Sequence, residues 1–206
     1  EKLIIQNPDK HFLVEGEINN KNFILSEKII KDVLNINLLD IKKINLNSEN
    51  TFSFKLDKKM KLTNFKFKSK AEINELIIVN TLKLKDIFPK IKEQINLNNH
   101  KLEISYDKGA FSINGKGDII LQNKKDKIQY LIENKNKNKN LNFNSTLEII
   151  DNPALIGILN YEKDKDSKLI IAIDGYKEKN EKIKIKNFSL KEKKNNIAFK
   201  NIIIAS

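Results

Sequence analysis

The feature that most constrains this chain is a repeated alternation of apolar and polar residues with a period of two. Residues 182–204 read KIKIKNFSLKEKKNNIAFKNIII, and Phe111, Ile113, Ile119 and Leu121 share one parity across a second long stretch. A period of two places successive side chains on opposite faces of a β-strand. The sequence therefore predicts long strands that each have one apolar and one polar face.

The same alternation recurs along the chain and predicts a mainly β fold. We expect strands at 12–18, 23–25, 52–56, 60–67, 77–84, 102–106, 111–121, 128–132, 141–149, 156–161, 169–173, 183–190 and 197–203. Asp107-Lys108-Gly109 lies between two of them, and a glycine there can take the positive φ of a tight hairpin turn. An antiparallel sheet built from hairpins follows.

The alternation slips by one residue at three asparagines, Asn64, Asn80 and Asn187. Such a slip would turn every later apolar side chain to the wrong face unless a bulge or a corner absorbs one residue. Bulges bend strands, so we predict one long antiparallel sheet that curls like a groove. Separate short strands joined by tight turns are the alternative.

Two segments break the period and predict one or two short helices against or beside the sheet. They follow Ser26 and Asp86, which are residue types that cap helix N-termini; Pro89 is tolerated in a first turn. Their apolar positions are Ile29, Ile30, Val33 and Leu34 in the first and Ile87, Phe88, Ile91 and Ile95 in the second.

Length and composition bound the remaining possibilities. The 206 residues begin at Glu1, and we expect a single β-rich segment, 1–206, of a longer protein, with any subdivision near 96–100. All of the positive charge behind the net +12 comes from lysine, which suits diffuse attraction better than the paired recognition of phosphate by arginine. Without cysteine the chain has no disulfide or thiolate chemistry, and no apolar run approaches the about 20 residues of a membrane-spanning helix.

Residues able to carry chemistry are scarce. His11 and His100 are far apart and have no neighbours at metal-ligand spacing, so we interpret both as polar surface residues. The Gly115-Lys116-Gly117 stretch lies inside an alternating strand, which favours a kink or close backbone packing over a phosphate loop. We therefore predict a protein that is not an enzyme and needs no metal or cofactor.

Nucleic-acid binding is the weakest of the alternatives. Residues 64–68 read NFKFK and interleave aromatic rings with lysines, as a platform for stacked bases does. Such a platform requires phenylalanine and lysine on one exposed face. We expect no nucleic acid among the partners.

The stretch from Leu159 to Ile204 resembles the AsmA-like group of bacterial envelope proteins, in particular its YhdP-type branch. That group carries a Leu-x-Tyr-x-Lys strand, then an apolar-x-apolar-x-Gly strand, then a strand around Ile-x-x-Phe-x-Leu. The matching positions are Leu159, Tyr161 and Lys163, then Ile171, Ile173 and Gly175, then Ile185, Phe188 and Leu190. The resemblance covers the second half of the chain well and the first half in style only.

This resemblance implies a bridge-like lipid-transfer protein that conducts phospholipid acyl chains through the periplasm, for outer-membrane biogenesis and lipid homeostasis. It also implies an anchor in the inner membrane, supplied by a part of the protein outside this segment. An apolar β-groove would hold those chains. The residues predicted to line it are Phe65, Phe67, Leu82, Leu84, Ile104, Phe111, Ile113, Ile119, Leu121, Ile171, Ile173, Ile183, Ile185, Phe188 and Leu190. The alternative is a structural scaffold or adhesin-like repeat that closes its apolar face with its own second sheet.

Overall fold

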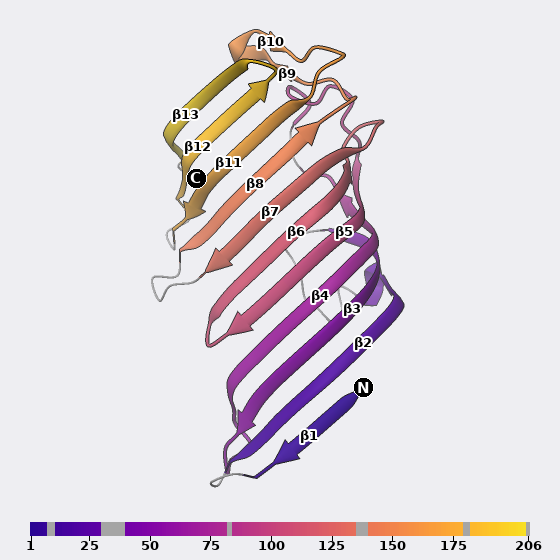
Figure 1. The fold of residues 1–206 in the computed structure, drawn as a ribbon, viewed down its shortest axis with the longest axis vertical. Coiled ribbons are helices and arrows are strands. Elements are labelled where there is room, and N and C mark those ends of the chain that lie inside the picture. The colour runs from indigo at the N-terminus through magenta and orange to yellow at the C-terminus, as the bar shows by residue number, and fades with distance from the viewer. Residues whose placement is uncertain (8–10, 30–39, 82–83, 135–139, 179–181, 205–206) are drawn as a thin grey trace.

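The computed structural model describes residues 1–7, 11–29, 40–81, 84–134, 140–178 and 182–204. They form an open antiparallel sheet of eleven strands in the order β1-β2-β3-β4-β5-β6-β7-β8-β11-β12-β13 (Figure 1). Strands that follow each other in the chain lie side by side in this sheet, except where β9 and β10 leave it between β8 and β11. The predicted mainly β, antiparallel fold is confirmed.

The strands of the large sheet are β1 (Lys2–Gln6), β2 (Phe12–Ser26), β3 (Ile41–Leu56), β4 (Leu62–Val79), β5 (Gln94–Asp107), β6 (Ala110–Ile120), β7 (Asp126–Asn134), β8 (Leu141–Ile149), β11 (Leu169–Lys177), β12 (Ile183–Glu192) and β13 (Asn195–Ile204). A separate pair consists of β9 (Leu155–Ile156) and β10 (Tyr161–Glu162), joined by the 3-10 turn η2 (Gly157–Leu159). The helix α1 (Glu27–Ile29) is a single turn.

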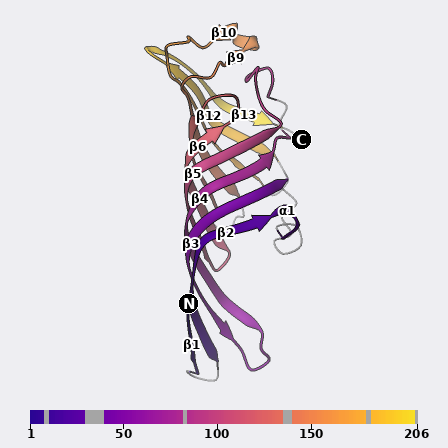
Figure 2. The ribbon, with the colours of Figure 1, turned by 90° about the vertical axis from the view of Figure 1, so that its right-hand side faces the viewer.

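The two ends of the strands are built differently. At one end, tight hairpins at 57–61 and 108–109 join β3 to β4 and β5 to β6; we call it the hairpin end. At the other, which we call the capped end, longer connections contain residues 84–93 and 150–168. Figure 2 shows α1 and the β4–β5 connection projecting from the same side of the sheet. One face of the sheet is therefore covered near the capped end.

Several strands are longer than their alternation predicted. The predicted strands 12–18 and 23–25 are one strand, β2, and residues 62–67 and 77–79 of the two strands predicted at 60–67 and 77–84 belong to β4. The second of these predictions is wrong at Asn80, Thr81 and Leu84, which follow the end of β4. Small side chains occupy the apolar parity in the middle of β3 and β4, where Ser48, Ser69 and Ala71 are buried. The Ser48 hydroxyl is satisfied there by the side-chain amides of Asn20 and Asn50, at 3.0 and 2.9 Å. The strands continue where the sequence no longer alternates.

Two of the three predicted bulges are confirmed. Asn64 has φ +52° beside a register shift between β3 and β4, and the register of β11 and β12 shifts where Asn187 donates to the Asp174 carboxylate at 2.8 Å. Both lie inside continuous strands, so separate short strands are wrong at these points. Asn80 is not a bulge: β4 ends at Val79, and the Asn80 N–H bonds to the carbonyl of Glu93 at 2.7 Å as the chain leaves the sheet.

Further asparagines mark irregularities that the sequence analysis missed. Asn22, Asn99 and Asn201 have φ of +50°, +48° and +58° inside β2, β5 and β13. Asparagine tolerates this left-handed conformation better than most residues, because its short polar side chain can bond locally. The predicted hairpin at 107–109 is confirmed, with positive φ at Lys108 and Gly109.

The remaining departures lie in the connections. The strand predicted at 156–161 is wrong, because η2 interrupts that segment. The helix predicted after Asp86 is also wrong: only isolated turns form, such as the Phe88 N–H to Leu84 carbonyl bond of 2.8 Å, and Pro89 holds Phe88 away from helical geometry. The helix after Ser26 begins as α1, and its Ile30, Val33 and Leu34 lie outside the described residues. Residues 96–100 lie inside β5.

Candidate functional site

The strand register gathers the apolar side chains of the large sheet on one face. Residues paired directly across an antiparallel ladder point to the same side of the sheet. Cross-strand pairs therefore trace this face from β2 to β13: Val14 with Phe54, Phe52 with Phe67, Ile104 with Ile113, Ile132 with Phe143, Ile173 with Phe188, and Phe188 with Phe199. We call it the apolar face.

The residues predicted to line a groove fall on this face wherever they belong to strands of the large sheet. These are Phe65, Phe67, Ile104, Phe111, Ile113, Ile119, Ile171, Ile173, Ile183, Ile185, Phe188 and Leu190. Leu121 directly follows β6, Leu84 belongs to the β4–β5 connection, and both pack with the core. Leu82 lies outside the described residues.

At the capped end the chain covers its own apolar face. Phe88 from the β4–β5 connection and Ala154 from the β8–β11 connection are buried in one cluster with Ile149 and Leu169, whose side chains are fully buried. Ile119, Leu121, Ile171, Phe188 and Leu190 pack in or against the same cluster. This half of the face is a conventional hydrophobic core.

A buried amide joins the two covering segments. The Gln122 side chain, just after β6, accepts a hydrogen bond from the Lys90 N–H at 3.0 Å and donates one to the Pro153 carbonyl at 2.8 Å. Both of its polar ends are satisfied, as a fully buried amide requires. Gln122 therefore ties both segments to the sheet.

A second buried pair fixes the β8–β11 connection. Asn152 donates to the Asp126 carboxylate at 2.7 Å and exchanges hydrogen bonds with the backbone of Lys124 at 2.8 and 3.0 Å. The Ile150 N–H donates to the same carboxylate at 3.0 Å. Burial raises the pKa of Asp126, and these two hydrogen bonds oppose that shift.

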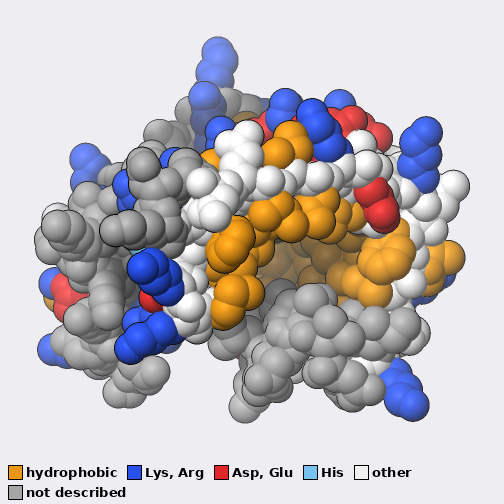
Figure 3. All heavy atoms as spheres, turned by 90° about the horizontal axis from the view of Figure 1, so that it is seen from below, with side chains coloured by type: hydrophobic (Ala, Val, Ile, Leu, Met, Phe, Trp, Pro, Cys, Tyr) orange, Lys and Arg blue, Asp and Glu red, His pale blue; other side chains and the backbone are white. Residues whose placement is uncertain are grey.

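Toward the hairpin end the apolar face continues beyond that cluster. Eight of the predicted residues, together with six that were missed, form what we call the hairpin-end band. It comprises Phe52, Phe54, Phe65, Phe67, Ile104, Tyr106, Phe111, Ile113, Ile132, Phe143, Ile173, Ile183, Ile185 and Phe199, and none of them belongs to the described core cluster. Figure 3 shows hydrophobic side chains gathered around a hollow.

The band is rich in aromatic rings that contact one another across strands or along them. Phe52 stacks on Phe54 with ring centroids 6.1 Å apart, and Phe65 meets Tyr106 at 5.7 Å. Phe188, at the edge of the cluster, meets Phe199 at 6.2 Å. The six missed residues lie on the same face as the predicted ones. Pairing the alternating residues of each predicted strand with those of its neighbour could have identified them.

Glycines on the apolar face lie under aromatic rings of the next strand. Gly16 faces Phe52, Gly115 faces Tyr130 and Gly175 faces Phe143, and in each pair an added Cβ would collide with the ring. The close packing predicted at Gly115 and Gly117 is confirmed. Because the glycine has no Cβ, each ring can lie close to the backbone of the neighbouring strand.

The interpretation of His100 as a polar surface residue is wrong. His100 is fully buried on the apolar face, stacks on Tyr130 at 5.5 Å, and finds no hydrogen-bond partner for either ring nitrogen within the described chain. An added Cβ at Gly117 would lie 2.6 Å from the His100 Cα, so the imidazole sits where only glycine leaves room. Burial lowers the pKa of His100. His11 is exposed, as predicted.

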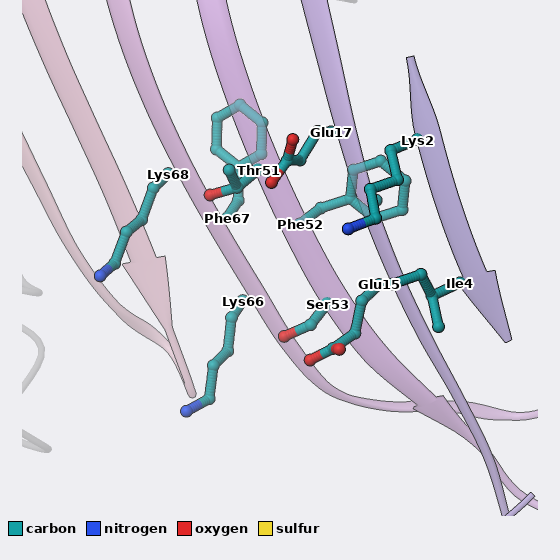
Figure 4. Close-up of a pocket in the computed structure, with 11 residues that line it drawn as sticks. Lys2, Ile4, Glu15, Glu17, Thr51, Phe52, Ser53, Lys66, Phe67 and Lys68 are labelled. Carbon is teal, nitrogen blue, oxygen red and sulfur yellow. The ribbon is translucent and has the colours of Figure 1, made fainter. Parts of the chain in front are cut away.

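The opposite face of the sheet is polar. Lys66 and Lys68 point to this side, away from Phe65 and Phe67 on the same strand, so basic and aromatic side chains do not share a face there. A pocket between β1 and β4 is lined by Glu15, Glu17, Lys66 and Lys68 with other residues (Figure 4). The two glutamates lie on β2 and the two lysines on β4, with β3 between them, so the opposite charges do not converge and the pocket is a solvated surface.

Comparison of the chain with protein-family models, with curated proteins and with solved structures gave no match. Among the described residues, no helix has the length and apolar character needed to cross a membrane. In the same part of the chain, no three histidine or acidic side chains are grouped as metal ligands would be.

Proposed function

We propose that this chain holds phospholipid acyl chains along the hairpin-end band and lets them move across the strands. The observation that carries the proposal is the register, which places a row of apolar side chains on one face of the nine neighbouring strands from β3 to β13. An apolar face of this extent needs either a covering layer or an apolar ligand. In the described chain the covering segments pack at the capped end.

The dimensions of the band suit lipid chains. The band crosses the nine strands from β3 to β13, which leave eight intervals, and at about 4.8 Å each the row is about 38 Å long. One leaflet of a bilayer is about 15 Å of hydrocarbon, half of a core about 30 Å thick. The row is long enough for about two acyl chains placed end to end.

The chemistry of the band suits movement as well as binding. Each methylene that leaves water for an apolar surface gains about 0.8 kcal/mol, so binding requires no catalytic group. A surface made mostly of isoleucine, phenylalanine and tyrosine side chains offers no single preferred site, which favours sliding. Asn134 and Lys177 are polar residues on the same face, because they pair with Phe111 and Ile183. In this proposal the bulges at Asn64 and Asn187 curl the sheet into a groove around the chains.

The resemblance to AsmA-like proteins adds a cellular setting to the proposal. The chain would then be a periplasmic segment of a protein anchored in the inner membrane by another part. Lysines on the polar face would keep the outside of the sheet in water while acyl chains occupy the inside. No enzyme activity or cofactor is part of this proposal.

A structural scaffold is the second candidate, and the capped end favours it. There the chain already buries its apolar face under its own connections, as a scaffold without a ligand would. The two candidates differ at the hairpin-end band: the lipid-binding function requires lipid on it, whereas a scaffold requires none.

Native mass spectrometry after incubation with phosphatidylethanolamine and phosphatidylglycerol vesicles separates them. We expect several bound phospholipids per chain without a preferred headgroup. Ile104→Asp, on the band, should remove most of the bound lipid, whereas Ser105→Asp on the polar face of the same strand should leave it. A folded chain that stays free of lipid, or equal loss in both variants, would support the scaffold.

A further inference from the structure

The last strand of the sheet has an unpaired outer edge. β13 pairs with β12 on one side, and no described strand lies on its other side. Ile203 and Ile204 are 64% and 47% exposed, and Lys200 is the only charged residue of the strand. Proteins usually protect such edges with charges, prolines or very short strands. At the opposite edge β1 has five residues and pairs only with Leu13–Glu17, so β1 and the rest of β2 share that edge.

The pairing with β12 assigns every residue of β13 except Asn201 to a face. Ile197, Phe199, Ile202 and Ile204 pair with β12 residues of the apolar face, whereas Ala198, Lys200 and Ile203 pair with residues of the polar face. The phase changes between Phe199 and Ile202, where Asn201 takes its positive φ. The strand therefore consists of two halves of opposite parity.

We propose that β13 pairs antiparallel with β13 of a second copy of this chain, about a two-fold axis between residues 200 and 201. In this register Ile197 faces Ile204 of the second copy, Ala198 faces Ile203, Phe199 faces Ile202 and Lys200 faces Asn201. The six positions other than Lys200 and Asn201 then match in face, because the phase change lies at the axis. A shift of one residue in either direction places an apolar-face residue opposite a polar-face residue.

The geometry of this pairing is favourable in two further respects. A two-fold axis perpendicular to the sheet keeps both apolar faces on the same side, so the two sheets join as one. Lys200 lies opposite an asparagine rather than another lysine, which avoids like charges at directly paired positions. The overlap of eight residues is about 27 Å long at 3.4 Å per residue. This pairing does not depend on lipid binding.

Cysteine cross-linking tests both the partner and the register. The chain has no native cysteine, so Ala198→Cys and Ile203→Cys chains can be prepared separately and then mixed under mild oxidation. Opposite Cα atoms would be about 5 Å apart, within the range of a disulfide. In either variant alone, the two identical cysteines would be offset by five residues, or about 17 Å along the strand.

We expect a covalent dimer on a non-reducing gel from the mixture and little from either variant alone. Sedimentation velocity of the unmodified, lipid-free chain should show a dimer that grows with concentration. A monomer up to about 100 μM would overturn the proposal, as would equal cross-linking in all three samples. A mixture of Ser105→Cys and Ser112→Cys chains, altered on the polar face away from this edge, controls for random collision.

Discussion

The two ends of the apolar face share one sheet and one kind of side chain, yet they differ in what covers them. At the capped end, Phe88 and Ala154 close a core in which Ile149 and Leu169 lose all contact with water. At the hairpin end, no segment among the described residues packs into that core, and Tyr106 and Phe199 remain 37% and 38% exposed. Alternation therefore specifies an apolar face, whereas the connections decide which part of it becomes core.

The largest expected effect compares two residues of β11 on the same face. Leu169→Ala removes a fully buried side chain at the capped end and should cost about 2–5 kcal/mol of unfolding free energy. Ile173→Ala lies in the hairpin-end band and should cost clearly less without lipid, because less of its surface is buried. Urea unfolding of both variants measures the difference. Equal costs would mean that both ends are equally well packed.

Removal of the Gln122 side chain, which joins the two covering segments, should have the next largest effect. Gln122→Ala leaves the Lys90 N–H and the Pro153 carbonyl without their partner, which costs about 1–3 kcal/mol for buried groups. Hydrogen exchange should become faster at residues 84–93 and 150–156 while the hairpin end is unchanged. Gln129→Ala, on the exposed polar face, is the matched control. Faster exchange throughout the sheet would contradict this local role of Gln122.

The pH dependence of the unfolding free energy probes the buried His100. Burial lowers the pKa of His100, so below the ordinary value of 6.5 the unfolded chain binds a proton that the folded chain resists. Stability should be full above pH 6.5 and should fall as pH drops through 6.5 toward the lowered pKa, by at most about 1.4 kcal/mol per pH unit for one group.

Urea midpoints between pH 7.5 and 5.5 measure this effect. The His100→Phe variant keeps an aromatic ring against Tyr130 and should remove most of the slope in that window. An unchanged slope in the variant would show that another group titrates there.

The smallest expected effect lies on the polar face. Lys43 and Glu75 form an ion pair of 2.6 Å with both side chains partly exposed. Lys43→Ala should change the unfolding free energy by less than about 1 kcal/mol, and added salt should shrink the difference further. A larger loss, insensitive to salt, would show that the polar face contributes to the stability of the sheet as the capped end does.

The sequence predicted the strands best where alternation was unbroken, as in β6 and β8. It failed in the middle of β3 and β4, because Ser48, Ser69 and Ala71 hide the apolar parity in small side chains. A slip of the alternation at an asparagine predicted the bulges at Asn64 and Asn187. The same signal is present at Asn99, because the apolar positions change from odd to even numbers between Leu97 and Leu102.

The candidate face was predictable in part for the same reason. Parity alone selected Phe67, Ile104 and Ile173 for the apolar face, but it could not show that Phe88 covers Ile119 rather than extending the row. His100 was misjudged because its burial depends on Gly117 of the neighbouring strand, a contact between residues far apart in the chain. Which residues become covered is a property of the connections, and their irregular turns carry no periodic signal.

The most direct test of the account is to locate bound lipid on the sheet. A phospholipid with a photoactivatable group at the end of its acyl chain can be bound, irradiated and mapped by peptide mass spectrometry. We predict adducts along the hairpin-end band on several strands, including the peptides that contain Phe67, Ile104 and Ile173, with none at Ile149 or Leu169. Adducts spread evenly over both faces, or confined to the polar face, would contradict the proposal that the band holds acyl chains.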